Sequence, residues 1–469
     1  MALILTRRNL ILAAALLIVV GGLMLPRAEG LSLEGQRSLI VFAVCLVLWV
    51  TQTLPLSVTG LLVFVLLPFL GVLSPTETFS LFGNKAVFFI LGALILSSGL
   101  MKTGLSSRLA FLFLSRFRRS PMSLALGILI SSAFLTFWMP EHAVAALLFP
   151  IVLEICFALK LRPLESRYAK LLFLSLAWGT VIGGVGTLLG GARNPLAIQI
   201  LQETYGVSIG FFEWIVAVFP VVVINLLITL VVLRLFFRPD IEDIRPATEI
   251  LREEIAMRGP MAGGEKRMVA VMLVVIFLWI TKSEVLGLAN IALVGAVSLF
   301  ILRVVSWEDA EEYVNWGILL MYGGAVAIAS ALSETGAAHW LANTLFADRT
   351  LTPFALVALT ALGAKLLTEG ISNVAAVAIL LPIGFSLGNI HGVNPIIIVY
   401  AVAVSAGLAF CLPMGTPPNA ICISSGYYRV ADCIRPGLIL LIASWLVFLL
   451  AVKIYWPLIG IQLTLSPTP

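Results

Sequence analysis

Apolar stretches of roughly membrane-spanning length follow one another along almost the whole chain. A spanning helix needs about 20 predominantly apolar residues, and about eleven stretches come close to this length. They lie near residues 9–25, 38–54, 57–73, 85–103, 171–203, 211–237, 268–287, 288–305, 314–334, 394–425 and 436–457. This pattern predicts an all-α polytopic membrane protein with about 11 transmembrane helices.

Two further apolar stretches, residues 120–158 and 350–390, are interrupted near the middle by polar residues or proline. We interpret both as re-entrant hairpins, which enter and leave the membrane on the same side. With a cytoplasmic N-terminus, this topology places most basic residues in the cytoplasm, as the positive-inside rule requires. Besides the linker 238–267, these are Lys102, Arg108, Arg116, Arg118, Arg119, Lys160, Arg162, Arg167, Lys170, Arg429 and Arg435. We therefore predict an inner-membrane protein with its N-terminus inside and its C-terminus outside.

The composition supports the membrane assignment. Of the 469 residues, 61% are hydrophobic and 11% are charged, whereas about a quarter of the residues in a soluble domain are charged. Loops between apolar stretches account for the net charge of +5, so we expect lipid around the protein and no nucleic-acid partner. The five cysteines have no CxxC or CxxH spacing, so we expect small apolar side chains without a cofactor.

The second half of the chain repeats the first. The Thr-Gly pair at 103–104 recurs at 335–336, which is 232 positions later, and the apolar run 143–151 recurs at 375–383 with the same offset. Asn194 has a counterpart in Asn419, 225 positions later. An odd number of predicted crossings separates the copies, so the two copies have opposite orientations. The sequence therefore predicts two inverted repeats, each with one hairpin.

Polar residues interrupt the second repeat at two places where a transport site is expected. Gly370 ends one helix, and Ser372 and Asn373 favour the start of the next. A hairpin tip of this kind presents free backbone N–H groups and a positive helix end, which suits an anion. Further on, the run 413–419 contains three prolines and a glycine, which forbid a continuous helix. The carbonyl groups freed by such a break can bind a cation.

These two segments carry a resemblance to a known family. Ser372-Asn373-Val374, followed by Pro382, resembles the hairpin tip of the divalent anion:sodium symporters, and residues 415–420 resemble their broken helix. The resemblance implies a homodimer that moves a small anion, with C4-dicarboxylate favoured over citrate or sulfate, together with sodium. It implies an elevator mechanism, in which a transport domain slides against a scaffold. On this division, residues 1–118 and 239–349 form the scaffold, and 119–238 and 350–469 form the transport domain.

The resemblance also assigns site residues. The expected substrate-binding residues are Glu141, His142, Arg193, Asn194, Ser372, Asn373, Val374, Thr416, Pro417 and Asn419. The expected sodium-binding residues are Thr368, Ser372, Asn373, Gly415 and Thr416. No catalytic residue is expected.

The first repeat departs from the family pattern. At the position of a second Ser-Asn-Thr tip, the chain has Pro140-Glu141-His142, and Arg193 precedes Asn194. Two interpretations stay open. In one, Glu141 and Arg193 form a structural ion pair at the start of a capped helix. In the other, Arg193 replaces a sodium ion or contacts the substrate, and Glu141 or His142 carries a proton, since ionisable groups inside membranes usually serve transport.

Other classes explain the sequence less well. A lipid-transferring enzyme needs acidic pairs near the membrane or a His/Glu metal set. HExxH does not occur, and the DxxD run at Asp240–Asp243 lies in the charged linker 238–267. The alternative function is a sodium/proton antiporter or an arsenite-type permease of the same superfamily. An antiporter needs an essential carboxylate in a broken helix, for which Glu141 and Glu369 are the candidates. Lys365 lies four residues before Glu369, and we expect these two side chains to pair with each other.

Overall fold

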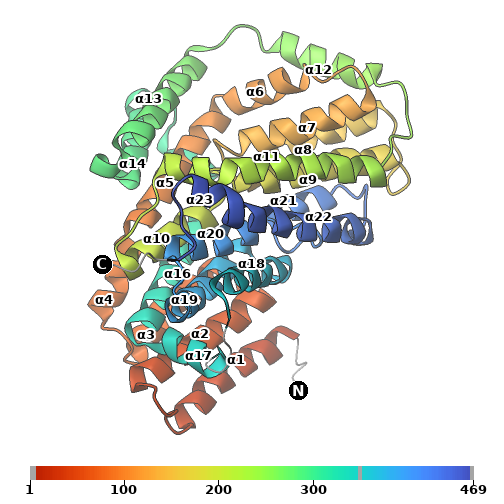
Figure 1. Ribbon diagram of the computed structural model, residues 1–469. Coiled ribbons are helices and arrows are strands. Elements are labelled where there is room, and N and C mark those ends of the chain that lie inside the picture. The colour runs from red at the N-terminus through yellow and green to blue at the C-terminus, as the bar shows by residue number, and fades with distance from the viewer. Residues whose placement is uncertain (1–6, 347–350, 465–469) are drawn as a thin grey trace, which may run out of the picture.

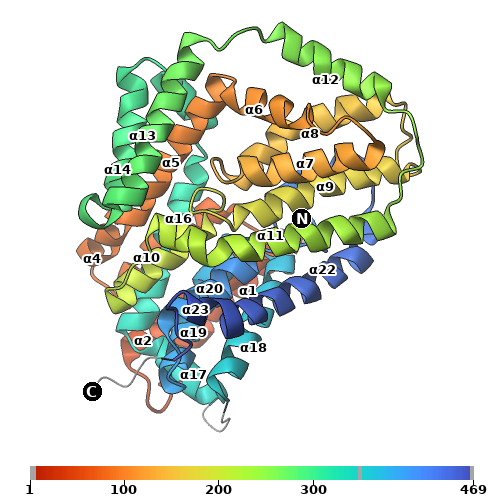
Figure 2. The same cartoon turned by 45° about the horizontal axis from the view of Figure 1, so that its top comes forward.

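The computed structural model describes residues 7–346 and 351–464, so residues 1–6, 347–350 and 465–469, which fall in the expected domain segments, lie outside the description. The first half contains α1 (Arg7–Met24), α2 (Leu33–Thr51), α3 (Leu56–Phe69), α4 (Pro75–Ser80), α5 (Lys85–Lys102), α6 (Leu105–Leu114), α7 (Pro121–Leu135), α8 (Glu141–Ala158), α9 (Arg167–Gly184), α10 (Arg193–Tyr205) and α11 (Phe211–Phe236). The linker helix α12 (Arg245–Met257) follows and lies across one end of the molecule (Figures 1 and 2).

The second half is also helical. It contains α13 (Gly263–Leu286), α14 (Leu288–Ile301), α15 (Trp307–Tyr313), α16 (Trp316–Glu334), α17 (Ala337–Phe346), α18 (Pro353–Gly370), α19 (Asn373–Ile390), α20 (Pro395–Ala406), α21 (Pro417–Ile423), α22 (Val430–Leu450) and α23 (Trp456–Leu458). Within the described residues, ten helical segments are long and apolar enough to cross a membrane. The protein is thus an all-helical polytopic membrane protein.

Seven of these ten segments match predicted spans, and the other three, α8, α18 and α19, belong to the predicted hairpins. Four of the eleven predicted spans are not among the ten. The predicted stretches 171–203 and 394–425 are each two helices in the structure, α9 with α10 and α20 with α21, separated by irregular backbone. The helices α3 and α14 are shorter than the apolar stretches that predicted them. Breaks also occur in the middle of both predicted hairpins, at residues 136–140 and 371–372. The positions of these breaks confirm the prediction from proline, glycine and helix-capping residues.

The element order of the first half recurs in the second. The helices α3, α4, α6, α7 and α8 begin 232 residues before α14, α15, α17, α18 and α19, respectively. Packing partners are exchanged between the halves in the same way. The helix α5 packs on α14 while α3 packs on α16, and α10 packs on α19 while α21 packs on α8. A helix of each half therefore packs against the hairpin of the other half.

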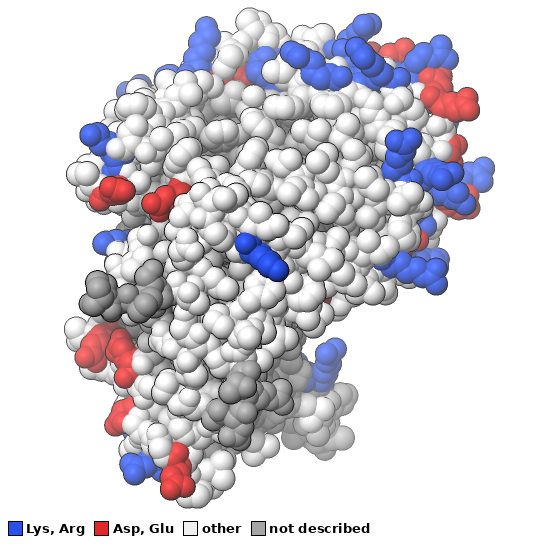
Figure 3. Space-filling view, viewed as in Figure 1, with Lys and Arg blue, Asp and Glu red and all other residues white. Residues whose placement is uncertain are grey.

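Charged side chains are distributed unevenly over the surface. A broad face with hardly any charged side chain extends across the middle of the molecule (Figure 3). Basic side chains gather along the top and right edges of this view, and acidic ones form a group at the lower left. An uncharged belt between charged edges is what a bilayer-embedded protein requires, because charges inside hydrocarbon are costly.

Candidate functional site

The carboxylate of Glu141 lies where both hairpins and both broken helices meet. Glu141 is the first residue of α8, after Pro140 at the N-cap, and its backbone N–H donates to the carbonyl of Gly190 at 2.9 Å. One carboxylate oxygen accepts a hydrogen bond from Arg193 Nη1 at 3.0 Å. The other oxygen accepts from Asn373 Nδ2 at 3.2 Å and from Thr416 Oγ1 at 3.0 Å. Residues from α8, α10, α19 and the start of α21 thus share one carboxylate.

This cluster is closed off from solvent. The side chains of Glu141 and Arg193 are 6% and 1% exposed, and Asn373 and Thr416 are equally buried. Two charges can stay in such a place only because each neutralises the other and hydrogen bonds satisfy the carboxylate. The structural ion pair considered from the sequence is therefore present.

Arg193 keeps hydrogen-bonding capacity that the described protein atoms do not use. Its Nη1 donates to Glu141, but Nε and Nη2 are buried without a hydrogen-bond partner among the described residues. These two nitrogens form one edge of the planar guanidinium, with parallel N–H groups that fit a carboxylate or sulfate side-on. Both lie against Gly407, which follows α20.

Oxygen atoms gather on the other side of Asn373. Thr368 Oγ1 lies 2.7 Å from Asn373 Oδ1 and donates to the carbonyl of Ala406 at 2.8 Å. Ser372 is at the N-cap of α19 as predicted, but its side chain makes no capping bond to the helix. A hydroxyl that is not used for capping is available to a ligand. Val374 is buried beside it and contributes no polar atom.

Two asparagines support the broken helices in the same manner. Asn194 Nδ2 donates to the carbonyls of Gly184 and Thr187, at 3.1 and 2.7 Å. Asn419 Nδ2 donates to the carbonyls of Ala409 and Leu412, at 3.1 and 3.4 Å. In each case the acceptors lie ten and seven residues earlier. The two amides therefore hold the irregular backbone in place, and the Oδ1 atom of each is buried with no hydrogen-bond partner among the described residues.

A glycine in each break allows the hairpin to approach closely. A Cβ atom at Gly190 would lie 2.5 Å from the carbonyl oxygen of Thr136, at the end of α7. A Cβ atom at Gly415 would lie 2.5 Å from the carbonyl oxygen of Thr368, at the corresponding point of α18. Both distances are below van der Waals contact, so a larger residue would push the hairpin away from the broken helix.

The predicted pairing of Lys365 with Glu369 is wrong. The carboxylate of Glu369 accepts hydrogen bonds from the backbone N–H groups of Phe410, Cys411 and Leu412, at 2.8 to 3.1 Å. Lys365 is fully buried and donates to Ser444 Oγ at 2.8 Å. The broken segment after α20 exposes three adjacent N–H donors, which form a stronger set of partners for a carboxylate than one ammonium group on the same helix.

In the first repeat, Thr187 joins the hairpin to the broken helix, as Glu369 does in the second. Thr187 Oγ1 donates to the carbonyl of Phe137 at 3.0 Å and accepts from the N–H groups of Leu189 and Gly190, both at 3.2 Å. Phe137 is 232 positions before Glu369, so Thr187 and Glu369 join hairpin to broken helix at equivalent places. We did not predict either contact from the sequence. The only available signal was the repeat offset itself, applied to residues near the breaks.

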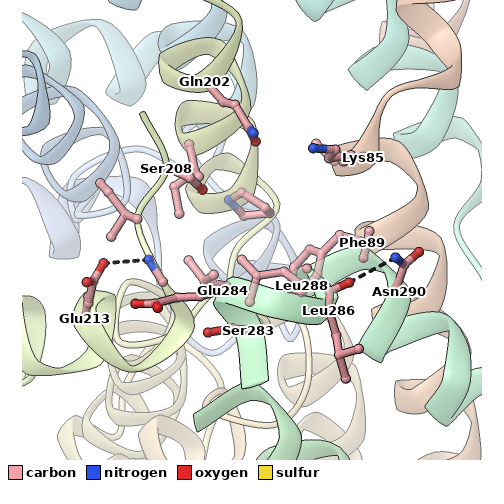
Figure 4. Close-up of a pocket in the computed structure, with 18 of the residues that line it drawn as sticks. Lys85, Phe89, Gln202, Ser208, Glu213, Ser283, Glu284, Leu286, Leu288 and Asn290 are labelled. Atoms are coloured by element: carbon pink, nitrogen blue, oxygen red, sulfur yellow. Dashed lines mark hydrogen bonds between the residues drawn. The ribbon is translucent and has the colours of Figure 1, made fainter. Parts of the chain in front are cut away.

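The remaining predicted residues lie at the margins of the cluster. His142 follows Glu141 on α8 and is half-buried, while Pro417 is exposed at the start of α21. A cavity of about 790 Å³ reaches the first broken helix from the side of the α13–α14 connection and is lined there by Leu188 and Pro195. Lys85 of α5 and Gln202 of α10 lie on opposite walls of it (Figure 4). Sequence analysis missed this cavity, because its walls come from distant segments.

Comparison with known proteins agrees with this architecture. The family described as sodium:sulfate symporter transmembrane region matches residues 6–462. The sodium-dependent dicarboxylate transporter SdcS of Staphylococcus saprophyticus is 29% identical over 475 residues, which cover 95% of this chain and 91% of that protein. SdcS of Staphylococcus aureus (strain USA300) is 30% identical over 451 residues, which cover 90% and 86%.

Two solved structures share the fold at low sequence identity. MtrF of Neisseria gonorrhoeae, from a class of antimetabolite efflux pumps, has a TM-score of 0.56 at 14% identity, and the match covers 97% of this chain and 96% of MtrF. The YdaH transporter of Alcanivorax borkumensis has a TM-score of 0.50 at 14% identity, covering 82% and 88%. Together with the family match over nearly the whole chain, the broken helices and paired hairpins lead to one assignment. The chain belongs to the sodium:sulfate symporter family of membrane transporters.

Proposed function

We propose that this protein carries a small dicarboxylate across the inner membrane together with sodium, with citrate or sulfate as alternative cargo. The observation that supports this most directly is the buried cluster of donors around Glu141. Arg193, Asn373 and Thr416 come from three different elements, and all three direct hydrogen-bond donors at one carboxylate. Donors that already hold one carboxylate have the chemistry to bind the carboxylate of a substrate. Relatives at 29–30% identity are named as sodium-dependent dicarboxylate transporters.

A single sodium site in the second repeat fits this chemistry. Thr368 Oγ1, Asn373 Oδ1 and the carbonyl of Ala406 lie close together, with the unused hydroxyl of Ser372 one residue before Asn373. Sodium prefers oxygen ligands, and irregular backbone in a transporter commonly supplies them. Gly415 and Thr416 complete the proposed set. In the first repeat Arg193 holds a fixed positive charge, which attracts a carboxylate 4 Å away by roughly 4 kcal/mol at an effective dielectric of 20.

The proposed movement is an elevator. The recurring helix bounds and the exchanged packing support two inverted repeats. From the family resemblance, we propose a scaffold of residues 1–118 and 239–349 and a transport domain of 119–238 and 350–469. We also propose a homodimer with a cytoplasmic N-terminus and an external C-terminus, on the basis of the family resemblance and the distribution of basic residues.

Uptake into proteoliposomes tests the proposal. Purified protein is reconstituted, and accumulation of labelled succinate and labelled sulfate is followed with an inward sodium gradient and with choline replacing sodium. We expect saturable succinate uptake that requires sodium. Uptake of neither anion under any sodium gradient, by protein that reconstitutes normally, would contradict the proposed function. Sodium efflux driven by a proton gradient would instead indicate an antiporter.

A further inference from the structure

The proposed substrate donors are already occupied by a side chain of the protein itself. Glu141 accepts hydrogen bonds from Asn373 Nδ2 and Thr416 Oγ1 and neutralises Arg193. These are the groups that the proposed function assigns to a substrate anion. Glu141 therefore stands in for the anion, and it is attached to the first hairpin.

Without the Glu141 carboxylate, a site with no anion would contain buried donors without partners and the unpaired charge of Arg193. A buried donor left without a partner is destabilising, and an uncompensated buried charge is more so. In an elevator carrier the whole transport domain must cross the membrane, either with its anion or empty. A site that holds unpaired donors and a net positive charge would cross readily with an anion and poorly without one. Such a protein would exchange anions across the membrane instead of accumulating them.

We propose that Glu141 is a tethered counter-anion that allows the empty carrier to return. When the substrate leaves, the Glu141 carboxylate, which stays paired with Arg193, takes over the donors of Asn373 and Thr416. The empty transport domain then contains a site with no net charge, in which the Asn373 and Thr416 donors are satisfied, and it can cross the membrane. When substrate enters, it displaces Glu141 from Asn373 and Thr416. This inference rests on the proposed function, and it makes the protein a net importer instead of an obligate exchanger.

The experiment compares two modes of transport in the same proteoliposomes. Net uptake is measured as labelled succinate entering liposomes that contain no anionic substrate, with an inward sodium gradient. Exchange is measured with liposomes preloaded with unlabelled succinate and equal sodium on both sides. The variant Glu141→Gln keeps the size of the side chain and removes its charge. The matched control is Glu154→Gln, which removes the same charge from an exposed position on the same helix.

We expect wild type and Glu154→Gln to show both modes. In Glu141→Gln the ratio of net uptake to exchange, measured at equal reconstituted protein, should fall at least tenfold relative to wild type. The double variant Glu141→Gln with Arg193→Gln carries neither of the two charges. Its ratio of net uptake to exchange should therefore lie between the ratios of Glu141→Gln and wild type.

Two outcomes would refute the inference, and a third would refute the proposed function. If wild type exchanges succinate but never accumulates it, the tethered counter-anion is refuted while anion transport stands, and this result requires no variant to fold. An unchanged ratio of net uptake to exchange in Glu141→Gln refutes it as well. If wild type shows neither mode with succinate or sulfate, the proposed function itself has failed.

Discussion

Asn373 donates its side-chain amide to the carboxylate of Glu141 over 3.2 Å, although the two residues are 232 positions apart. This separation equals the repeat offset, so the two residues occupy the same position in the two halves, each as the first residue of the second hairpin helix. A residue and its own repeat counterpart therefore meet at the centre of the molecule. Such a contact between counterparts is expected on a pseudo-two-fold axis.

The first prediction concerns Asn373. Replacing it with alanine removes a donor to Glu141 and an oxygen beside Thr368. We expect succinate uptake to fall to background while the amount of protein in the membrane stays normal. The control is Asn389→Ala, which removes an exposed amide near the end of the same helix. Normal uptake by Asn373→Ala would exclude the second hairpin tip from the site.

The second prediction concerns the buried ion pair. Arg193→Ala leaves the carboxylate of Glu141 buried without its counter-charge, which typically destabilises a protein by about 3–5 kcal/mol. We expect a clear loss of thermal stability in detergent. Adding Glu141→Gln to this variant should restore much of the stability, because neither charge is then left alone. Equal melting temperatures for wild type and Arg193→Ala would show that the pair contributes no stability.

The third prediction concerns sodium. If Arg193 supplies the positive charge in the first repeat, one sodium site remains, and uptake should follow sodium with a Hill coefficient of about 1. Thr368→Val removes the hydroxyl beside Asn373 and should raise the sodium concentration needed for half-maximal uptake. Thr344→Val, which alters an exposed hydroxyl on α17, serves as the control. A wild-type dependence on two or more sodium ions would contradict this prediction.

The fourth prediction concerns Gly190 and Gly415. Alanine at either position places Cβ 2.5 Å from a threonine carbonyl oxygen, so we expect both variants to lose most uptake. Gly363→Ala in α18 has no atom within 4 Å of its Cβ. It should therefore transport normally and gain about 0.5–1 kcal/mol of stability, as alanine does over glycine inside a helix. Uptake measured at equal reconstituted protein distinguishes these results, and active Gly190→Ala protein would argue against close packing there.

The fifth prediction concerns the carboxylate of Glu369. Glu369→Gln loses the charge that attracts three backbone N–H groups, and hydrogen bonds to a charged group contribute about 1.5–3 kcal/mol. We expect thermal stability to fall by an amount in this range. Glu154→Gln changes the same group at an exposed site and should leave stability unchanged. A stable Glu369→Gln protein would mean that the segment after α20 is held in place by other contacts.

The breaks in the helices could be predicted from the sequence because their causes are local. Proline, glycine or a helix-starting residue lies in or beside each break, and the repeat pointed to the counterpart of each one. The pairing of Lys365 with Glu369 failed for the opposite reason. Four-residue spacing on one helix indicates that two side chains are near each other, but it says nothing of the N–H groups of residues 410–412 that the fold brings to Glu369.

The site itself was predictable in part. The sequence indicated that Glu141 and Asn373 hold equivalent places and that Glu141 and Arg193 could pair, and the structure contains both relationships. It did not indicate that Thr416 also donates to Glu141, because that contact depends on how the end of one repeat packs on the hairpin of the other. Contacts of this kind follow from three-dimensional packing and leave no spacing pattern in the sequence.

The exchanged packing of α10 on α19 and of α21 on α8 has a consequence for biosynthesis. The first hairpin and Arg193 enter the membrane long before Asn373 and Thr416 are translated, so the nascent first half must tolerate its charged residues without them. Its carboxylate and guanidinium can already neutralise each other, since both belong to that half. The second half then contributes only uncharged donors to the centre. The Glu141–Arg193 pair can therefore form before the second half is inserted.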